Sequence, residues 1–302
     1  MVRTKGILLE ELTWRGAEEV LRPETVVVIP IGAACKEHGP HLKLKNDWML
    51  AEYLKGELLK NAAVVIAPTV NYHYYPAFAE YPGSVTLRLE TARDLMVDIC
   101  VSLARYGPRK FYALNTGVST IEPLELAAKI LAVDGIQLRY TDILKLIGPA
   151  ELSIKQEEGG THADEIETSV MLFIAPSTVD MSKAVKDYNH QSKGKLTRNP
   201  NGAGIYSPSG IYGDATLATR WKGEIVVRAI IRGILTEIDE LPEFGSCRIR
   251  RWRSGLWLVI DRPPRDEVFD SASSRLEAGL CSRHGFFHPE LLQILTPDSF
   301  IV

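Results

Sequence analysis

The sequence predicts an α/β fold of three layers, in which helices flank a central, mainly parallel sheet. Short, uncharged, β-branched runs alternate with longer segments whose apolar residues recur three and four positions apart. This alternation repeats from about residue 25 to residue 140. Strand and helix in this rhythm favour parallel strands joined by helical crossovers. In such sheets, chemistry gathers in the loops beyond the carboxyl ends of the strands.

The individual elements follow in order along the chain. The expected strands are residues 25–31 (TVVVIPI), 63–67, 110–114 and 137–140. The expected helices are residues 48–59, 91–106, 124–133 and 217–238. Thr91 can cap the second helix, and a Gly-Pro pair at 107–108 ends it. Residues 187–213 are rich in Gly, Pro, Asn and Ser, and predict a long surface loop.

Composition excludes several classes of protein. Of the 302 residues, 45% are hydrophobic and 24% are charged, which is typical of a soluble globular chain. A net charge of −3 leaves no excess of basic residues to bind nucleic acid. The sequence contains no run of eighteen apolar residues, so we expect no membrane-spanning segment and no membrane partner. The four cysteines form no CxxC pair, and the N-terminal segment lacks the apolar core of a signal peptide. We therefore expect a cytoplasmic protein with reduced thiols.

The composition changes after Pro242. Every lysine lies before residue 223, whereas arginines continue to residue 283. We treat residues 1–243 as one domain and residues 244–302 as an appended, Arg-rich segment of unassigned role.

The first candidate site follows the first expected strand. Glu37, His38, His41 and Asp47 place two imidazoles and two carboxylates within eleven residues. The intervening Gly-Pro pair interrupts any helix, so we expect a loop that folds these groups toward one point. Imidazole nitrogen with carboxylate oxygen suits Zn²⁺, Mn²⁺ or Fe²⁺, and Asp47 can bridge two ions with its two oxygens. The alternative is a polar loop whose histidines bond to the backbone.

The second candidate site is the segment 161–169 (THADEIETS), just before an apolar helical run. His162 and Glu165 are three residues apart and can face one point. Glu167 lies about 200° round a helix from Glu165, which predicts a supporting role unless the helix starts later. The alternative for Asp164 and Glu165 is simple stabilisation of the start of the helix by acidic residues.

Two further segments offer groups for substrate binding. Residues 72–83 (YHYYPAFAEYPG) can wall a pocket with His73 and Tyr81, although a packed loop is the favoured alternative. Residues 115–120 (NTGVST) offer hydroxyls and backbone amides. Ser119 has no GxSxG context, so it is a candidate for substrate binding rather than a nucleophile.

Four of these stretches together resemble the creatininase family. They are residues 29–47 (IPIGAACKEHGPHLKLKND), 80–87 (EYPGSVTL), 161–176 (THADEIETSVMLFIAP) and 209–224 (SGIYGDATLATRWKGE). The resemblance covers about residues 8–240. It implies a central, mainly parallel sheet, a site of one or two metal ions that activates water against a C–N bond, and assembly into oligomers, often hexamers.

The resemblance also implies roles for individual residues. His38 and Asp47 match metal ligands, with Asp47 in the bridging place. Glu165 matches an acidic ligand, and His162 matches a histidine that can donate a proton. Glu167 matches the Glu of the family's Glu-Thr-Ser sequence, whose role we leave open.

Two departures from the family pattern argue against a complete two-metal site and against creatinine itself as substrate. Lys36 stands where the family has a glutamate ligand, and Glu37 directly precedes His38. Either a bulge brings Glu37 into the ligand position, or Lys36 displaces that ligand. Gly117 stands where the family has a histidine ligand, so His41 or His73 would have to replace it.

The leading hypothesis is a metal-dependent amidohydrolase that acts on a small cyclic or linear amide and forms a homo-oligomer. Zn²⁺ or Mn²⁺ is the expected cofactor, with Fe²⁺ as a further candidate and one or two ions per chain. The ligand candidates are Glu37, His38, His41, Asp47 and Glu165, and the candidates for catalysis are Lys36, His162 and Glu167. One alternative is a mononuclear hydrolase, lyase or isomerase in which Lys36 acts as a base. Another is a catalytically silent member that binds a ligand or serves as a scaffold.

Overall fold

The structure, a computed structural model, describes residues 4–188, 194–241, 251–253 and 256–258. All of them fall in a compact unit, Met1–Asp261. The expected domain boundary at residues 243–244 and most of the Arg-rich segment lie outside the described residues.

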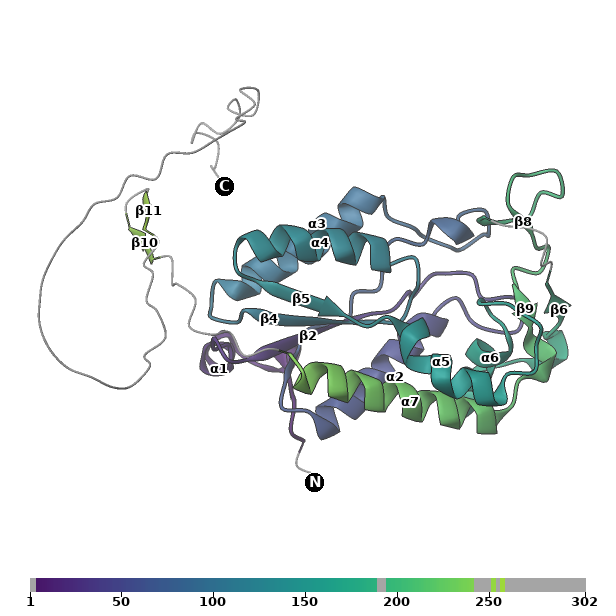
Figure 1. Cartoon of the computed structure of the whole chain (residues 1–302), viewed down its shortest axis with the longest axis horizontal. Coiled ribbons are helices and arrows are strands. Elements are labelled where there is room, and N and C mark those ends of the chain that lie inside the picture. Colours follow the sequence, from purple (N-terminus) through teal and green to yellow (C-terminus); the bar gives the residue numbers. More distant parts are fainter. Residues whose placement is uncertain (1–3, 189–193, 242–250, 254–255, 259–302) are drawn as a thin grey trace, which may run out of the picture. The chain divides into compact units, whose positions relative to one another are not determined.

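A five-stranded parallel sheet forms the centre of this unit (Figure 1). In spatial order its strands are β1 (Ile7–Leu8), β3 (Val65–Ile66), β2 (Val26–Ile31), β4 (Lys110–Asn115) and β5 (Gln137–Tyr140). The β2 and β4 strands pair residue by residue, from Val26 opposite Lys110 to Ile31 opposite Asn115. Their carboxyl ends therefore lie side by side. The predicted parallel sheet flanked by helices is confirmed, with β1 as an additional edge strand.

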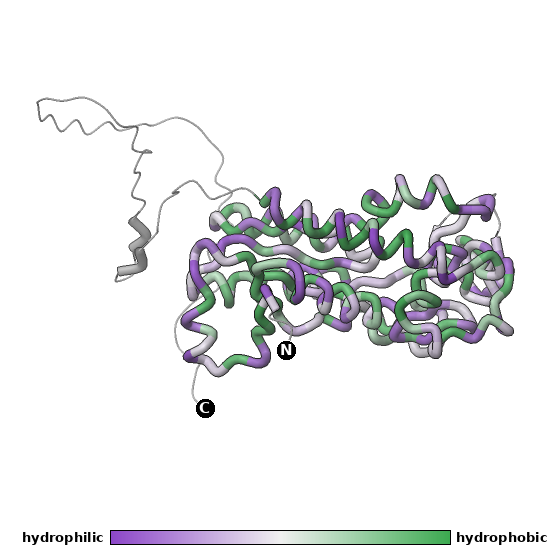
Figure 2. The backbone as a smooth tube through the Cα atoms, turned by 90° about the horizontal axis from the view of Figure 1, so that it is seen from below, coloured by the Kyte–Doolittle hydropathy of each residue, from purple (hydrophilic) through white to green (hydrophobic). Residues whose placement is uncertain are grey.

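Helices cover both faces of the sheet and complete three layers (Figure 1). One face carries α3 (Leu89–Ala104) and α4 (Ile121–Val133). The other carries α2 (Asn46–Asn61), α5 (Ile143–Ile154), α6 (Glu165–Ile174) and α7 (Arg220–Asp239), while α1 (Trp14–Val20) lies near the amino end of β2. Figure 2 shows hydrophobic and hydrophilic residues alternating along these helices.

Each strand supplies both apolar layers because successive side chains point to opposite faces. Val27 and Ile29 of β2 belong to the core beneath α3 and α4, whereas Val28 between them belongs to the core beneath α2 and α7. This double burial explains why these strands read as uninterrupted hydrophobic runs.

The helix ends differ in detail from the prediction. The helix α3 begins at Leu89, so Thr91 lies inside its first turn, and Arg88 at the cap position makes no side-chain cap bond. The α7 helix begins at Arg220, where Thr219 caps it by accepting from the Lys222 amide. The helix α5 contains an interior proline, Pro149, and was not predicted.

The expected loop 187–213 contains short ladders. Lys186–Asp187 (β6) pairs antiparallel with Gly213–Asp214 (β9), and Leu196–Thr197 (β7) pairs parallel with Ile205–Tyr206 (β8). Short 3₁₀ turns occur at Leu9–Glu11, Pro76–Phe78, Pro176–Thr178, Met181–Lys183 and Ala215–Leu217. Arg251–Arg253 (β10) and Leu256–Leu258 (β11) pair antiparallel with each other.

The α6 and α7 helices approach unusually closely, and this contact fixes the start of α6. A Cβ atom on Gly223 of α7 would collide with the carbonyl oxygen of Ser169. The Ser169 hydroxyl donates to the Glu165 carbonyl oxygen (2.6 Å) and accepts from the Thr219 amide (3.0 Å). The first turn of α6 is thereby held against the start of α7.

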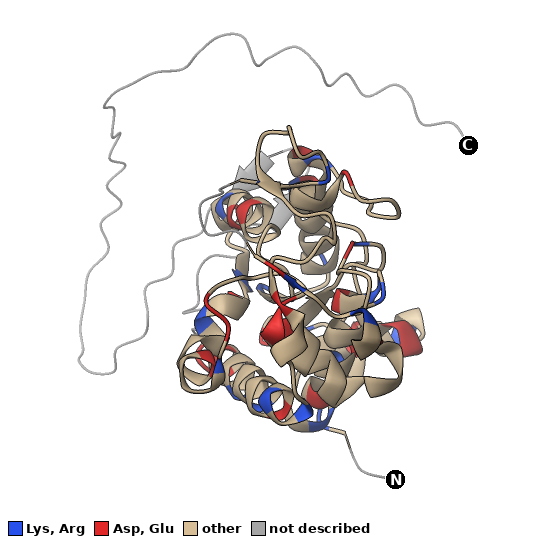
Figure 3. Cartoon of the chain, turned by 90° about the vertical axis from the view of Figure 1, so that its right-hand side faces the viewer, with Lys and Arg blue, Asp and Glu red and all other residues tan. Residues whose placement is uncertain are grey.

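No described helix combines the length and the apolar character needed to cross a membrane. Acidic and basic residues intermix over the face of the molecule seen in Figure 3.

Candidate active site

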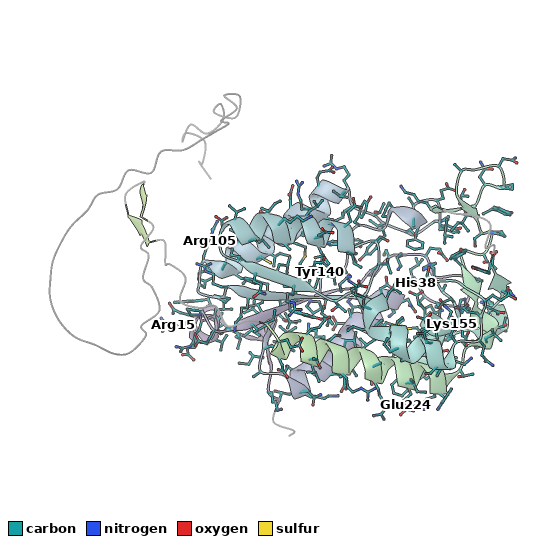
Figure 4. The ribbon with its side chains drawn as sticks, viewed as in Figure 1. Arg15, His38, Arg105, Tyr140, Lys155 and Glu224 are labelled. Carbon is teal, nitrogen blue, oxygen red and sulfur yellow. The ribbon has the colours of Figure 1, made fainter. Side chains whose placement is uncertain are left out.

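The ionisable groups of the first candidate site gather beyond the carboxyl end of β2. Lys36, Glu37, His38 and His41 lie in the loop that leaves this strand, and Asp47 lies in the first turn of α2. All five residues are buried. Figure 4 labels His38 beyond the ends of the strands. The structure therefore brings the predicted loop residues to the edge where parallel sheets carry their sites.

The two ring nitrogens of His38 have different partners, and the nitrogen that faces the Asp47 carboxylate carries no proton when the ring is neutral. Its Nδ1 lies 2.9 Å from the Lys36 carbonyl oxygen, and its Nε2 lies 2.8 Å from Asp47 Oδ1. A carbonyl can only accept, so Nδ1 carries the hydrogen, and Nε2 of a neutral imidazole presents a lone pair. Two lone pairs at this distance need a proton or a cation between them.

The other oxygen of Asp47 is paired with a lysine. The Lys36 Nζ lies 2.6 Å from Asp47 Oδ2, with both side chains almost fully buried. Burial alone would lower the pKa of Lys36, but the carboxylates of Asp47, Glu167 and Glu37 outweigh it and raise that pKa above its usual value. Burial would raise the pKa of Asp47, but Lys36 and His38 hold it well below its usual range. The pair is therefore ionised at neutral pH.

His162 lies between two glutamates. Its Nε2 is 3.0 Å from Glu37 Oε2, and its Nδ1 is 3.6 Å from Glu167 Oε2. Ala163 adopts a left-handed backbone conformation (φ 49°), and its amide donates to Glu167 Oε2 (2.6 Å). This rare conformation for a residue with a Cβ atom turns the chain sharply between His162 and the start of α6.

Three groups come together as a possible metal site. One ligand atom from each of His38, His162 and Glu167 lies within 4.8 Å of the other two. Two imidazole nitrogens with one carboxylate oxygen suit Zn²⁺, Mn²⁺ or Fe²⁺. A cation between His38 Nε2 and Asp47 Oδ1 would satisfy both atoms, as a proton would. These residues fit one divalent ion.

Glu37 is held beside His162 by its backbone surroundings. Its Oε1 accepts from the Gly39 amide, and a Cβ atom on Gly210 (φ 83°) would collide with this carboxylate. A side chain at position 210 is therefore excluded by both conformation and space.

Glu165 does not reach this point, contrary to the sequence expectation. Its carboxylate accepts from the backbone amides of Gln156 (2.9 Å) and Glu157 (2.7 Å) and from the Lys222 ammonium group. The expectation assumed helical spacing between His162 and Glu165, but α6 begins only at Glu165. Glu165 instead ties the loop before α6 to α7.

The remaining predicted residues have other surroundings. His41 Nε2 lies 2.8 Å from the Thr168 hydroxyl, and burial lowers the pKa of His41 to about 4. Burial likewise lowers the pKa of His73 to about 4, and neither of its ring nitrogens has a hydrogen-bond partner among the described residues. The Tyr81 hydroxyl donates to the Ser207 carbonyl oxygen (2.7 Å). His73 and Tyr81 thus belong to a packed loop.

A cavity of about 450 Å³ opens onto the site. Its lining includes Lys36, Asp47, His162, Glu167 and Ser119. Its apolar walls come from the helices α2, α5, α6 and α7: Leu50, Ile143, Ile147, Val170, Val226 and Ile230. Gly117, at the family's histidine position, lines the cavity without a side chain.

Sequence reasoning missed Phe78, and it gave Asp164 only as an acidic residue that stabilises the start of the helix. Phe78 places its ring 4.9 Å from Lys36 Nζ, and nothing in the periodicity of an aromatic loop indicates this contact. Asp164 caps α6 by accepting from the Ile166 and Glu167 amides (2.9 Å each). Burial and the carboxylates of Glu157 and Glu167 raise the pKa of Asp164 well above its usual value. Its place before a helical run is a signal that identifies the cap.

Fold and site together define an α/β protein with a buried centre of histidines, carboxylates and a lysine at the carboxyl edge of its sheet. The model of the creatininase family, described as creatinine amidohydrolase, matches residues 10–238. The chain belongs to this family.

Two described proteins are similar to this chain over most of its length. Creatinine amidohydrolase of Pseudomonas putida is 27% identical over 258 residues, which span 78% of this chain and 98% of that protein. The mycofactocin precursor peptide peptidase of Mycolicibacterium smegmatis is 26% identical over 241 residues, spanning 76% and 88% of the two chains.

Solved structures share the fold. A manganese form of creatininase superposes with a TM-score of 0.65 at 22% identity, covering 79% of this chain and all of that one. A mutant creatininase described as a Zn-Zn type gives 0.65 at 23% identity, covering 79% and 99%.

Proposed function

We propose that this chain is a metal-dependent hydrolase that cleaves the C–N bond of an amide. The observation that carries the proposal is the meeting of His38, His162 and Glu167 beside a cavity that His162 and Glu167 line. The similarity to an amidohydrolase and to a peptide peptidase supports the same bond type. Manganese and zinc forms of similar structures favour Zn²⁺ or Mn²⁺.

Each residue of the centre has a part in this proposal. His38, His162 and Glu167 would hold the ion, and Asp47 Oδ1 lies 2.8 Å from His38 Nε2. A bound divalent ion supplies hydroxide at neutral pH by lowering the pKa of a water molecule. Glu37 orients His162 through their contact of 3.0 Å.

The remaining polar groups of the cavity would act on the amide itself. The Lys36 ammonium group can donate to the carbonyl oxygen of the substrate. The leaving nitrogen needs a proton, and the carboxyl group of Asp164, which also lines the cavity, would supply it in this proposal.

The cavity narrows the class of substrate. Its volume of about 450 Å³ falls in the range of small-molecule sites. Its lining combines the ionisable groups of the site with aliphatic side chains from four helices. We expect a small cyclic or linear amide that carries an apolar group, with its C–N bond beside the ionisable groups.

The first test compares two glutamates two positions apart. Glu167→Gln should lose the bound ion and lower hydrolysis by at least about 100-fold, since even outer-shell changes at metal sites cost 10- to 100-fold. Glu165→Gln is the matched control, because it should retain the ion at the cost of stability. Elemental analysis of protein purified without chelator, followed by a screen of amides, provides the measurements. Full metal content and activity in Glu167→Gln would refute the assignment.

We also propose a homo-oligomer, which the family resemblance supports. Light scattering from the full chain tests it, and a mass equal to one chain at micromolar concentration would contradict it.

A further inference from the structure

We propose that the ammonium group of Lys36 takes the place of a second metal ion, so that the centre combines one divalent ion with one built-in organic cation. The inference deepens the proposed function and rests on it. It assigns Lys36 as a fixed positive charge that faces the substrate, rather than as a base.

The first observation is that the two carboxylate oxygens of Asp47 have different partners. Its Oδ1 lies 2.8 Å from Nε2 of His38, one of the three residues of the candidate metal site. Its Oδ2 lies 2.6 Å from Lys36 Nζ. A carboxylate that bridges two cations gives one oxygen to each. Here one of the two places is already filled by an ammonium group from the chain itself.

The second observation is the surroundings of the ammonium group. Lys36 Nζ lies 4.9 Å from the ring centroid of Phe78 and 5.7 Å from that of Tyr75. Aromatic faces stabilise a cation without neutralising it. The ring faces offer a divalent ion no ligand atom. Burial and Asp47 raise the pKa of the Tyr75 hydroxyl, which therefore stays neutral and is a weak ligand beside an imidazole or a carboxylate. This place therefore suits an organic cation.

The third observation is the chemistry of the neighbouring wall. Residues 116–119, which also line the cavity, are Thr, Gly, Val and Ser. They provide neither the imidazole nor the carboxylate that Zn²⁺ or Mn²⁺ prefers. In the described part of the chain, the ligand groups that come together are those of His38, His162 and Glu167, and residues 116–119 are not among them.

The arrangement gives the ammonium group a function. One of its hydrogens faces Asp47, and the group lines the same cavity as His162 and Glu167. A substrate carbonyl bound in this cavity can accept a hydrogen bond from it. Negative charge that develops on this oxygen would then meet a fixed positive charge with no need for a second ion.

The test is the number of ions bound per chain, measured by elemental analysis and by titration of Zn²⁺ or Mn²⁺ into the full-length protein. We expect one ion in the wild type and two in Lys36→Glu, because the new carboxylate replaces the cation with a ligand. Lys36→Arg, which keeps a cation, should bind one. Lys55→Met is the matched control: Lys55 is also buried and paired with a glutamate, Glu10, outside the cavity. It should bind one ion with normal activity.

Activity provides a second readout. Lys36→Met should keep its ion but lose at least about 100-fold in kcat, the loss typical of removing one donor to a developing oxyanion. Two ions in the wild type, or one ion in a folded Lys36→Glu, would overturn the inference and leave the proposed hydrolase intact. One ion without hydrolysis of any amide would overturn the proposed function instead. The number of ions bound to the wild-type protein tests the inference even if Lys36→Glu does not fold.

Discussion

The most informative single change concerns His73, a buried histidine outside the site. Its side chain is fully buried, and neither ring nitrogen has a hydrogen-bond partner among the described residues. Burial lowers the pKa of this group from 6.5 to about 4. His73→Phe keeps a flat ring in the same space and removes the titration.

The sign of the effect follows from the direction of this shift. A base whose pKa is lower in the folded state binds fewer protons there than in the unfolded chain, so the folded state loses stability as the pH falls. The loss begins near pH 6.5 and is complete below about pH 4. The shift of roughly 2.5 units corresponds to about 3 kcal/mol in total and to about 2.5 kcal/mol at pH 4.5.

The assay is urea unfolding of the wild type and His73→Phe at several pH values between 7.5 and 4.5, followed by circular dichroism. The difference in the free energy of unfolding between the two proteins should grow by about 2.5 kcal/mol in favour of the variant over this range. Other groups that titrate, such as His41, contribute equally to both proteins and cancel. Parallel pH profiles would refute the reasoning, because they would mean that His73 does not titrate in this range.

Three further substitutions test the packing around α6. Lys222→Met leaves Glu165 as an unpaired buried charge and should cost about 3–5 kcal/mol in urea unfolding. The double variant Lys222→Met/Glu165→Gln should recover much of this loss, because it removes the charge but keeps an oxygen that accepts from the Gln156 and Glu157 amides. No recovery in the double variant would contradict the pairing. Gly223→Ala forces a Cβ atom against Ser169 and should lower stability by about 1–3 kcal/mol, and a neutral result would mean that the helices can separate. Ala163→Gly relieves the left-handed backbone and should leave stability unchanged or raise it by up to about 1 kcal/mol in thermal unfolding. A clear loss would argue against that conformation.

The sequence predicts the sheet well because its central strands obey a simple rule. The strands β2 and β4 are buried on both faces, so their runs are apolar apart from Lys110 and Asn115 at the ends of β4 and are easy to recognise. The helix α5 escapes the same reasoning, because Gly148 and Pro149 interrupt its apolar spacing.

The candidate site is only partly readable for a related reason. The cluster from Lys36 to Asp47 is local, and its position after a buried strand indicates its place. Whether Glu165 or Glu167 joins His162 at the candidate metal site depends on where α6 begins, and a shift of two residues in that start would change the answer. The left-handed conformation of Ala163 decides it, and residue type does not indicate such a conformation for alanine.

The walls of the site come from segments far apart in the chain, and this has a consequence for folding. His162 pairs by backbone bonds with Tyr212, and Glu165 needs Lys222 to balance its charge. Tyr81, near the site, is tied to Ser207. The centre can therefore form only once the chain has been completed through α7 and these distant segments have met. Affinity for an ion should accordingly be the last property to return on refolding, after helical structure has recovered.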